Sequence, residues 1–348
     1  MKKWSPDFNR FRAAVTRNGT PDRIPLAEVG IDIEVIEAYL GRPVDGIKTY
    51  IGFFKEAGYD YTLLQVRGQP IPDTFQVKIE EHELLLHGPE NSVSSHSSAR
   101  INDERTFNEY PWIGPENVYY RDVDRARDYL PDGMKLVVNH GPIFQSLFRM
   151  MGIENLSIAT VENPALIHSI AKKVGESSIN IVENLVQRDW VGAIWYGDDM
   201  AYTTGLLASP DFLREYVFPY LKRIGDVCRK YDKPLLMHSD GKLCEILEDI
   251  IACGVQGIHP NEPTSVDIFE MKRLWGDRLS LLGGIDLDLL TRGTPGQVVD
   301  LTKSMIDRFM DIGPQGIALG SSNSVAKYIS LDNYRAMLDT VRKYGRIS

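Results

Sequence analysis

The sequence lacks several features that would assign it to common classes of protein. Its 348 residues contain no apolar run near the ~20 residues that cross a bilayer, and the N-terminal segment has no apolar core of a secretory signal. A formal net charge of -9 excludes a general binder of nucleic acid or of anionic membranes. The three cysteines show no pairing pattern. We expect a soluble, reduced, cytoplasmic protein.

Two common catalytic motifs are also absent. There is no GxGxxG of the kind that binds dinucleotides, and Gly283-Gly284 is better explained by close approach of the backbone. There is no GxSxG nucleophile elbow, and Ser321-Ser322 follows an apolar run without that frame. We therefore expect neither a nucleotide cofactor bound in that mode nor a Ser-His-Asp hydrolase.

Short apolar runs alternate with longer amphipathic stretches along the chain, which is typical of repeated βα units. Runs that are apolar throughout indicate parallel strands buried on both faces. Eight such units predict a (β/α)8 TIM barrel, with residues 1–348 as a single domain. The expected strands are residues 23–29, 59–66, 134–139, 192–196, 234–237, 257–259, 279–283 and 316–319.

Two segments depart from this repeat. Residues 75–110 alternate polar and apolar side chains around Gly88-Pro89, which predicts a β-hairpin inserted after the second strand. Residues 143–189 are helical in pattern but interrupted near Gly152 and Pro164, so they predict two or three helices. The other expected helices are residues 210–230, 243–253, 265–274 and 294–310.

Polar side chains follow most of the predicted strands. In a parallel barrel all strands end at one rim, where barrel enzymes place their active sites. Three of the seven histidines and a surplus of carboxylates would meet there. The residues expected at this rim are Glu28, Asp32, Asn139, His140, Asp198, Asp199, His238, Asp240, His259, Glu262, Asp286, Ser321, Ser322 and Asn323.

His238 and Asp240 are the most informative pair at this rim. They are two residues apart at the end of an extended segment, so they share a face. A histidine beside an aspartate is often a structural pair in which the carboxylate fixes the imidazole tautomer. The convergence of titratable groups favours a functional role instead. Imidazole with carboxylates predicts a metal site, with zinc before manganese or iron.

Four motifs, in this order, resemble the uroporphyrinogen decarboxylase superfamily. They are GTPDRIPLAEVG at 19–30, GDDMAYTTGLLASPDFLREYVFPYLKRI at 197–224, LLMHSDGK at 235–242 and LGSSNSVAKYISLDNYRAMLDTVRKYG at 319–345. The resemblance spans almost the whole chain. It implies a (β/α)8 barrel and one of two activities, because the superfamily includes decarboxylases and zinc-dependent methyltransferases that work with corrinoid proteins.

The decarboxylase branch carries an arginine-rich N-terminal motif that binds the carboxylates of its substrate. This chain has Glu28 and Asp32 in the corresponding region, and these would repel a polycarboxylated tetrapyrrole. A metal-free decarboxylase of a smaller acid, with His238 as proton donor, stays an alternative if nearby arginines converge on the rim. These arginines are Arg67, Arg100 and Arg149.

The methyltransferase branch looks closer. Members that activate a thiol usually bind zinc through a His-x-Cys pair at the fifth strand and a second Cys near the eighth. This chain has His238, Asp240 and Ser321-Ser322 at these places, so a methyl-corrinoid:thiol methyltransferase is only an alternative. Asp198 and Asp199 are adjacent, and adjacent strand residues face opposite ways, so only one of them would complete the site. We prefer Asp199. The remaining candidate ligands are Asp240, Glu215 and Glu262.

Nitrogen and oxygen ligands leave a metal more electrophilic than thiolates do, which suits polarising an ether oxygen. With the resemblance, this predicts O-demethylation: a methoxylated aromatic compound gives its methyl group to cobalamin carried by a partner corrinoid protein. The catalytic candidates are His238 and Asp240, with His140, Tyr196 or Tyr202 as donor to the leaving oxygen. The substrate-binding candidates are Asn139, Phe144, Phe148, Trp195, Tyr202 and His259.

The corrinoid protein would dock at the rim, where residues 75–110 are expected to form part of the surface. A barrel that binds a corrinoid or an aromatic ligand without catalysis stays a further alternative. The sequence leaves open whether two copies of the chain form a homodimer.

Overall fold

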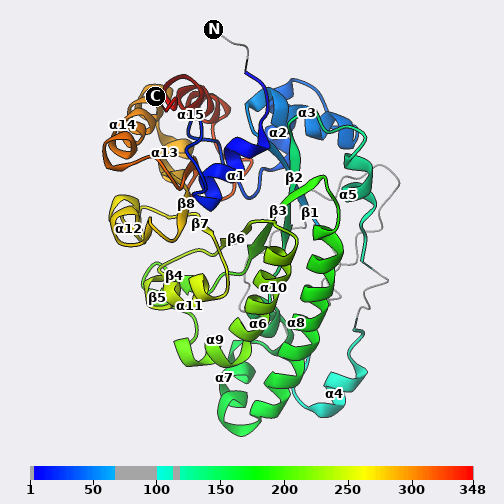
Figure 1. Cartoon of the computed structure of the whole chain (residues 1–348). Helices are drawn as coiled ribbons and strands as arrows, with labels where there is room; N and C mark the ends of the chain where they lie inside the picture. Colours follow the sequence, from blue (N-terminus) through cyan, green and yellow to red (C-terminus); the bar gives the residue numbers. More distant parts are fainter. Residues whose placement is uncertain (1–3, 67–99, 113–117, 348) are drawn as a thin grey trace.

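The computed structural model describes residues 4–66, 100–112 and 118–347. Seven parallel strands form one curved sheet in which each pairs with the next along the chain, and helices cover its outer face (Figure 1). This arrangement confirms the predicted α/β barrel fold. The strands are β1 (Tyr61–Gln65), β2 (Lys135–His140), β3 (Val191–Gly197), β6 (Leu235–His238), β7 (Gly257–His259), β8 (Ser280–Ile285) and β9 (Ile317–Ser321).

The first predicted strand, residues 23–29, is not a regular strand, so this prediction is wrong. The segment forms only isolated bridges, and the N–H of Ala27 and the C=O of Pro25 each form one backbone hydrogen bond of 2.9 Å with β9. Pro25 has no N–H to donate to a ladder. On the side of β1, the hydroxyl of Tyr61 lies 2.7 Å from both the N–H and the C=O of Glu28. A side chain therefore links this segment to β1.

Several helices begin at capping residues that the sequence identifies. Ser209 caps the N-terminus before Pro210, and Thr294 forms a capping box with Gln297. The helices are α1 (Phe8–Thr16), α2 (Ile33–Leu40), α3 (Ile47–Ala57), α4 (Glu104–Glu109), α5 (Arg121–Ala126), α6 (Phe144–Met151), α7 (Ile153–Glu162), α8 (Pro164–Val186), α9 (Pro210–Tyr216), α10 (Phe218–Lys230), α11 (Leu247–Ala252), α12 (Ile268–Trp275), α13 (Leu287–Arg292), α14 (Pro295–Ile312) and α15 (Leu331–Tyr344), with a short 3-10 helix η3 (Cys244–Ile246).

The structure confirms the prediction for residues 143–189 and describes only the end of the predicted hairpin at 75–110. The stretch 143–189 forms three helices, α6 to α8, with breaks at Gly152 and Asn163 as the sequence predicts. Of the predicted hairpin, residues 75–99 lie outside the described residues, and so does most of the docking surface expected there. Residues 104–109 form helix α4, whose N-terminus Asp103 caps, so the end of the predicted hairpin is helical.

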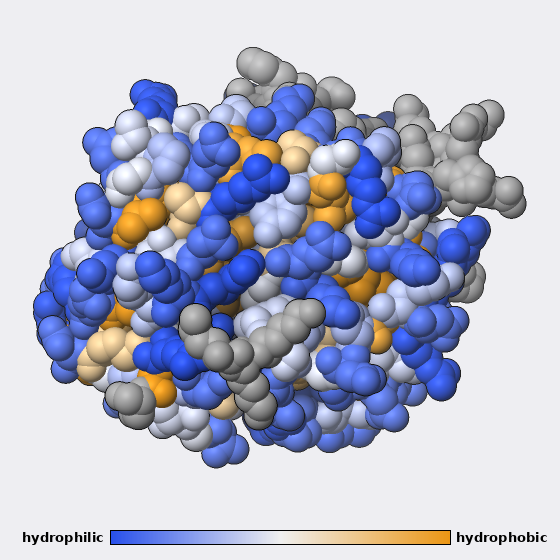
Figure 2. All heavy atoms as spheres, turned by 90° about the horizontal axis from the view of Figure 1, so that it is seen from above, coloured by the Kyte–Doolittle hydropathy of each residue, from blue (hydrophilic) through white to orange (hydrophobic). Residues whose placement is uncertain are grey.

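The face of the molecule that Figure 2 shows is mostly hydrophilic. Figure 2 shows one face on which apolar side chains form several separate patches between polar ones. Within the described ranges, no helix combines the length and hydropathy needed to cross a membrane.

Candidate metal centre

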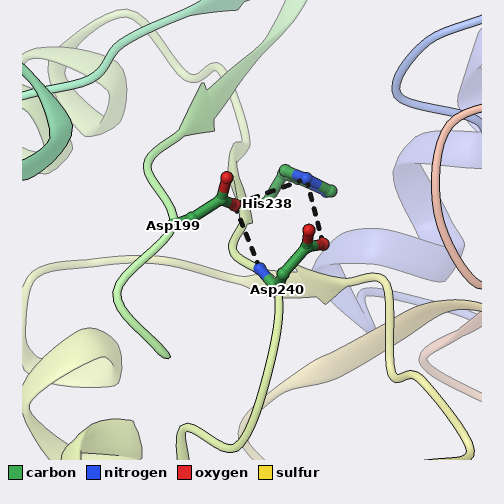
Figure 3. Close-up of side chains that lie close together, drawn as sticks. All are labelled: Asp199, His238 and Asp240. Carbon is green, nitrogen blue, oxygen red and sulfur yellow. Dashed lines mark hydrogen bonds and ion pairs between the residues drawn. The ribbon is translucent and has the colours of Figure 1, made fainter. Parts of the chain in front are cut away.

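Asp199, His238 and Asp240 point toward one another at the carboxyl ends of β3 and β6 (Figure 3). His238 is the last residue of β6, and each aspartate lies two residues beyond a strand. The Nε2 atom of His238 lies 3.6 Å from Oδ1 of Asp199 and 3.5 Å from Oδ1 of Asp240. Their side chains are between 14% and 36% exposed. Three ligand atoms therefore converge at a position that solutes reach.

The spacing of these atoms suits a small cation. Ligand atoms about 2.1 Å from a tetrahedral metal ion lie about 3.4 Å apart, which is close to the separations of 3.5 and 3.6 Å around His238 Nε2. Imidazole nitrogen and carboxylate oxygen are donors that zinc accepts, and three protein ligands are typical of catalytic zinc sites. The donor set fits zinc, and all three cysteines of the chain lie outside it.

The other ring nitrogen of His238 faces His259, with 2.8 Å between the two Nδ1 atoms. Burial, and then the nearby His238, holds the pKa of His259 well below its ordinary value, so its ring is neutral. Its buried Nε2 forms no hydrogen bond with any residue that the structure describes. One hydrogen therefore lies between the two Nδ1 atoms, and when His238 donates it, the lone pair of His238 Nε2 is directed at the two aspartates.

Hydrogen bonds from neighbouring side chains hold both carboxylates. Gln145 donates to Oδ2 of Asp199 at 2.8 Å, and Asn323 donates to Asp240 at 3.1 Å and to Glu262 at 3.3 Å. Glu262 is therefore a neighbour of the group. Gln145 is absent from the sequence-based candidates, because nothing in its context distinguishes it from a solvent-facing helical residue.

Negative charge accumulates around Asp240. Burial raises the pKa of this carboxyl; His238 opposes the shift, and the charges of Asp199 and Glu262 add to it. A cation bound among these groups would relieve their mutual repulsion.

The loop that carries Asp240 is held by a small hairpin of β4 (Ala201–Tyr202) and β5 (Gly205–Leu206). Gly241 has φ 84°, and a Cβ at this position would lie 2.6 Å from backbone atoms of Ala201, so glycine is required there. The N–H of Lys242 donates to the carbonyl of Tyr202 at 2.9 Å. The hairpin therefore fixes the turn between His238 and α11.

The carboxylate of Asp198 is buried among hydrogen-bond donors, although its neighbour Asp199 belongs to the candidate metal centre. Its carboxylate accepts hydrogen bonds of 2.8 to 2.9 Å from the N–H groups of residues 143–145 at the start of α6. The Tyr196 hydroxyl donates to it at 2.5 Å. Burial raises the pKa of Asp198 to about 6 although these bonds oppose the shift. The predicted ligand Asp198 and the predicted proton donor Tyr196 therefore bind each other, and neither belongs to the group formed by Asp199, His238 and Asp240.

Two further candidates do not reach the group. The Nε2 atom of His140 lies 3.0 Å from the Ser178 hydroxyl on α8, so the ring faces the helical layer, and burial lowers its pKa to about 4. Glu215 lies on α9, where its half-exposed carboxylate binds His168 at 3.0 Å. The predicted proton donor His140 and the predicted ligand Glu215 therefore bind Ser178 and His168 rather than the group formed by Asp199, His238 and Asp240.

The predicted substrate-binding residues differ in access. Trp195 is fully buried, and its ring packs edge-on against His259 with 5.5 Å between centroids. Asn139 pairs with Trp195 in register, so both face the barrel interior. Phe144 is also buried and packs against the half-buried Phe148 at 4.8 Å. Among these rings, Phe148 and the 61% exposed Tyr202 remain accessible.

Glu28 is buried in the seam of the barrel rather than at a ligand surface. Its Oε1 accepts from the N–H of Ser321 at 2.8 Å, and its Oε2 lies 2.6 Å from the Ser321 hydroxyl. That hydroxyl also contacts the carbonyl of Asn323. One hydroxyl hydrogen serves only one acceptor, so a proton on Glu28 satisfies both contacts. Burial raises the pKa of Glu28 to about 8. Glu28, expected from the sequence to repel an anionic substrate, is thus fully buried and bound to Ser321.

Glu28→Gln is expected to remove part of the pH dependence of stability. Burial raises the pKa of Glu28 from its ordinary 4.5 to about 8. In this range the folded state keeps a proton that the unfolded state has released. The stability of the wild type then falls, relative to the variant, by about 1.4 kcal/mol per pH unit over this window. Urea unfolding at pH 5, 7 and 9 measures this; parallel pH profiles for the two proteins would contradict it.

The fold and site define an α/β barrel protein with a candidate nitrogen and oxygen metal centre. The chain belongs to the uroporphyrinogen decarboxylase (URO-D) family, whose model matches residues 87–344. No curated protein sequence matches it.

Among solved structures, the chain is similar to a methyltransferase from Methanosarcina mazei, with a TM-score of 0.71 and 16% identity over 98% of this chain and 99% of that one. A sugar phosphate isomerase/epimerase from Parabacteroides distasonis has a TM-score of 0.40 and 11% identity, over 94% and 97% of the two chains. An intracellular xylanase from Thermoanaerobacterium saccharolyticum has a TM-score of 0.43 and 12% identity, over 97% and 99%. The first likeness establishes a shared fold over nearly the whole chain.

Proposed function

We propose that this protein is a zinc-dependent methyltransferase that moves the methyl group of a methoxylated aromatic compound to a corrinoid carried by a partner protein. The observation that carries the proposal is the convergence of Asp199, His238 and Asp240 on one point at the strand ends. The fold shared with a methyltransferase supports the class of reaction.

His238, Asp199 and Asp240 would hold the zinc. When bound by nitrogen and oxygen donors, zinc supplies a Lewis acid that polarises an ether oxygen. The other residues act on this donor set. His259 keeps the lone pair of His238 Nε2 directed at the aspartates, while hydrogen bonds from Gln145 and Asn323 orient the two carboxylates. His140 and Tyr196 face elsewhere, so no proton transfer to the phenol is attributed to them.

The contacts of Ser321 and Ser322 disfavour the alternative in which a thiol is the methyl acceptor. The first hydroxyl binds within the Glu28 cluster, and the second accepts from the N–H of Leu287 at 3.1 Å. Neither position offers a thiolate, and oxygen-rich donor sets make poor supports for a nucleophilic thiolate. A methyl donor with an oxygen leaving group therefore suits the site better.

The test is demethylation of methoxybenzoates and methoxyphenols by the zinc-loaded full chain with a reduced corrinoid protein. We expect equal amounts of methylated corrinoid and phenol, loss of activity with a chelator, and recovery on adding zinc. Release of carbon dioxide without methyl transfer would indicate a decarboxylase instead. Failure of every compound with a competent corrinoid partner would overturn the aromatic assignment.

A further inference from the structure

One face of α6 borders the candidate metal centre. Gln145, Phe148 and Arg149 are half-buried, whereas five of the other residues of this helix are buried. The spacings of three and four residues place these side chains on one face. This face therefore presents an amide, an aromatic ring and a guanidinium side by side.

The hydrogen bond of Gln145 fixes where this face lies. Its amide donates to Oδ2 of Asp199 at 2.8 Å, so this end of the face touches the candidate metal centre. Arg149 lies one turn further, about 6 Å along the helix axis, and its guanidinium is close enough to Asp198 and Asp199 for their charges to act on it. Arg149 thus lies one helical turn beyond Gln145, the residue of this face that touches the centre, a separation that a substituted benzene ring can span.

Arg149 has no direct partner among the residues that the structure describes: it forms no hydrogen bond or ion pair with any of them. Other arginines of the chain behave differently. Arg223 binds Glu176 and Arg278 binds Glu248 through two hydrogen bonds each, although both are more exposed. A half-buried guanidinium has lost part of its hydration, so it gains from an anionic partner.

We propose that Arg149 binds a carboxylate of the substrate while Phe148 contacts its ring, so that the substrates are methoxylated aromatic carboxylates rather than neutral methoxyphenols. This inference rests on the proposed function. The planar guanidinium matches a carboxylate through two parallel hydrogen bonds. A ligand held this way would extend along α6 from Arg149 toward Asp199 and His238.

The test compares binding of 3- and 4-methoxybenzoate with binding of the corresponding benzamides, by calorimetry on the zinc-loaded full chain. We expect the wild type to prefer each carboxylate by about 10- to 100-fold, the range of a charge-assisted hydrogen bond. Arg149→Gln is expected to lose this preference and keep its affinity for the amides, and Arg149→Lys to keep part of it. The control is Arg229→Gln, at the far end of α10, where Arg229 binds Asp226.

Equal affinity of the wild type for acids and amides, a preference that survives in Arg149→Gln, or no binding of the acids would overturn the inference. If Arg149→Gln lowers the melting temperature, the inference is tested instead by two other measurements. These are the carboxylate preference of Arg149→Lys and the difference in wild-type affinity between each acid and its amide. Binding requires no corrinoid and no turnover. An Arg149-dependent preference without methyl transfer would keep the anion site and overturn the proposed function. Methyl transfer from methoxyphenols as fast as from methoxybenzoates would overturn the anion site and keep the proposed function.

Discussion

His238→Ala is expected to lower kcat/KM for methyl transfer by more than about 100-fold. Loss of groups that only orient metal ligands costs roughly 10- to 100-fold, and His238 is itself a candidate ligand whose Nε2 faces both aspartates of the centre. The measurement is the rate of corrinoid methylation with zinc present in excess.

The matched control for this variant is His168→Ala. His168 is also a histidine that faces a carboxylate, but it is half-exposed and binds Glu215 on the helical surface. Its removal is expected to leave the rate within about twofold, as for surface substitutions. Activity of His238→Ala within tenfold of the wild type would contradict a role for this residue in the chemistry.

Asp198→Ala is expected to destabilise the fold by about 3 kcal/mol, whereas Asp199→Ala, one residue away, is expected to cost less than about 1 kcal/mol. Asp198 accepts three backbone hydrogen bonds from the start of α6 and a fourth from Tyr196. In the alanine variant these buried donors lose their acceptor. Asp199 is 29% exposed, so water replaces it in its contact with Gln145.

Urea unfolding with a chelator present measures this difference without the contribution of bound metal. The same two variants are expected to rank in the opposite order for methyl transfer, because Asp199 belongs to the donor group and Asp198 does not. Equal losses of stability in the two variants would contradict the division of roles between them.

Much of the fold follows from the sequence, because strands buried on both faces are apolar throughout and are easily located. The prediction of the first strand, residues 23–29, is wrong for a local reason. Pro25 cannot donate to a ladder, and the Tyr61 hydroxyl replaces backbone pairing to β1. A side chain that replaces backbone pairing between two neighbouring segments of the barrel cannot be identified from the pattern of apolar residues.

The site was only partly predictable for a related reason. Position at the carboxyl end of a strand identifies rim residues, but the side chains of adjacent residues face opposite sides. An error of one residue in the predicted position therefore assigns a side chain to the wrong face of the sheet. His140 and Tyr196 face the helical layer, whereas their neighbours Asn139 and Trp195 face the interior. Asp198 and Asp199 likewise divide between a helix cap and the candidate centre.

The most direct measurement is the metal content of the full chain purified without added metal or chelator, by elemental mass spectrometry, for the wild type and His238→Ala. We expect about one zinc per wild-type chain and a loss of most of it in the variant, with His168→Ala unchanged. A wild type without metal, or equal zinc in the wild type and His238→Ala, would contradict a metal centre at Asp199, His238 and Asp240.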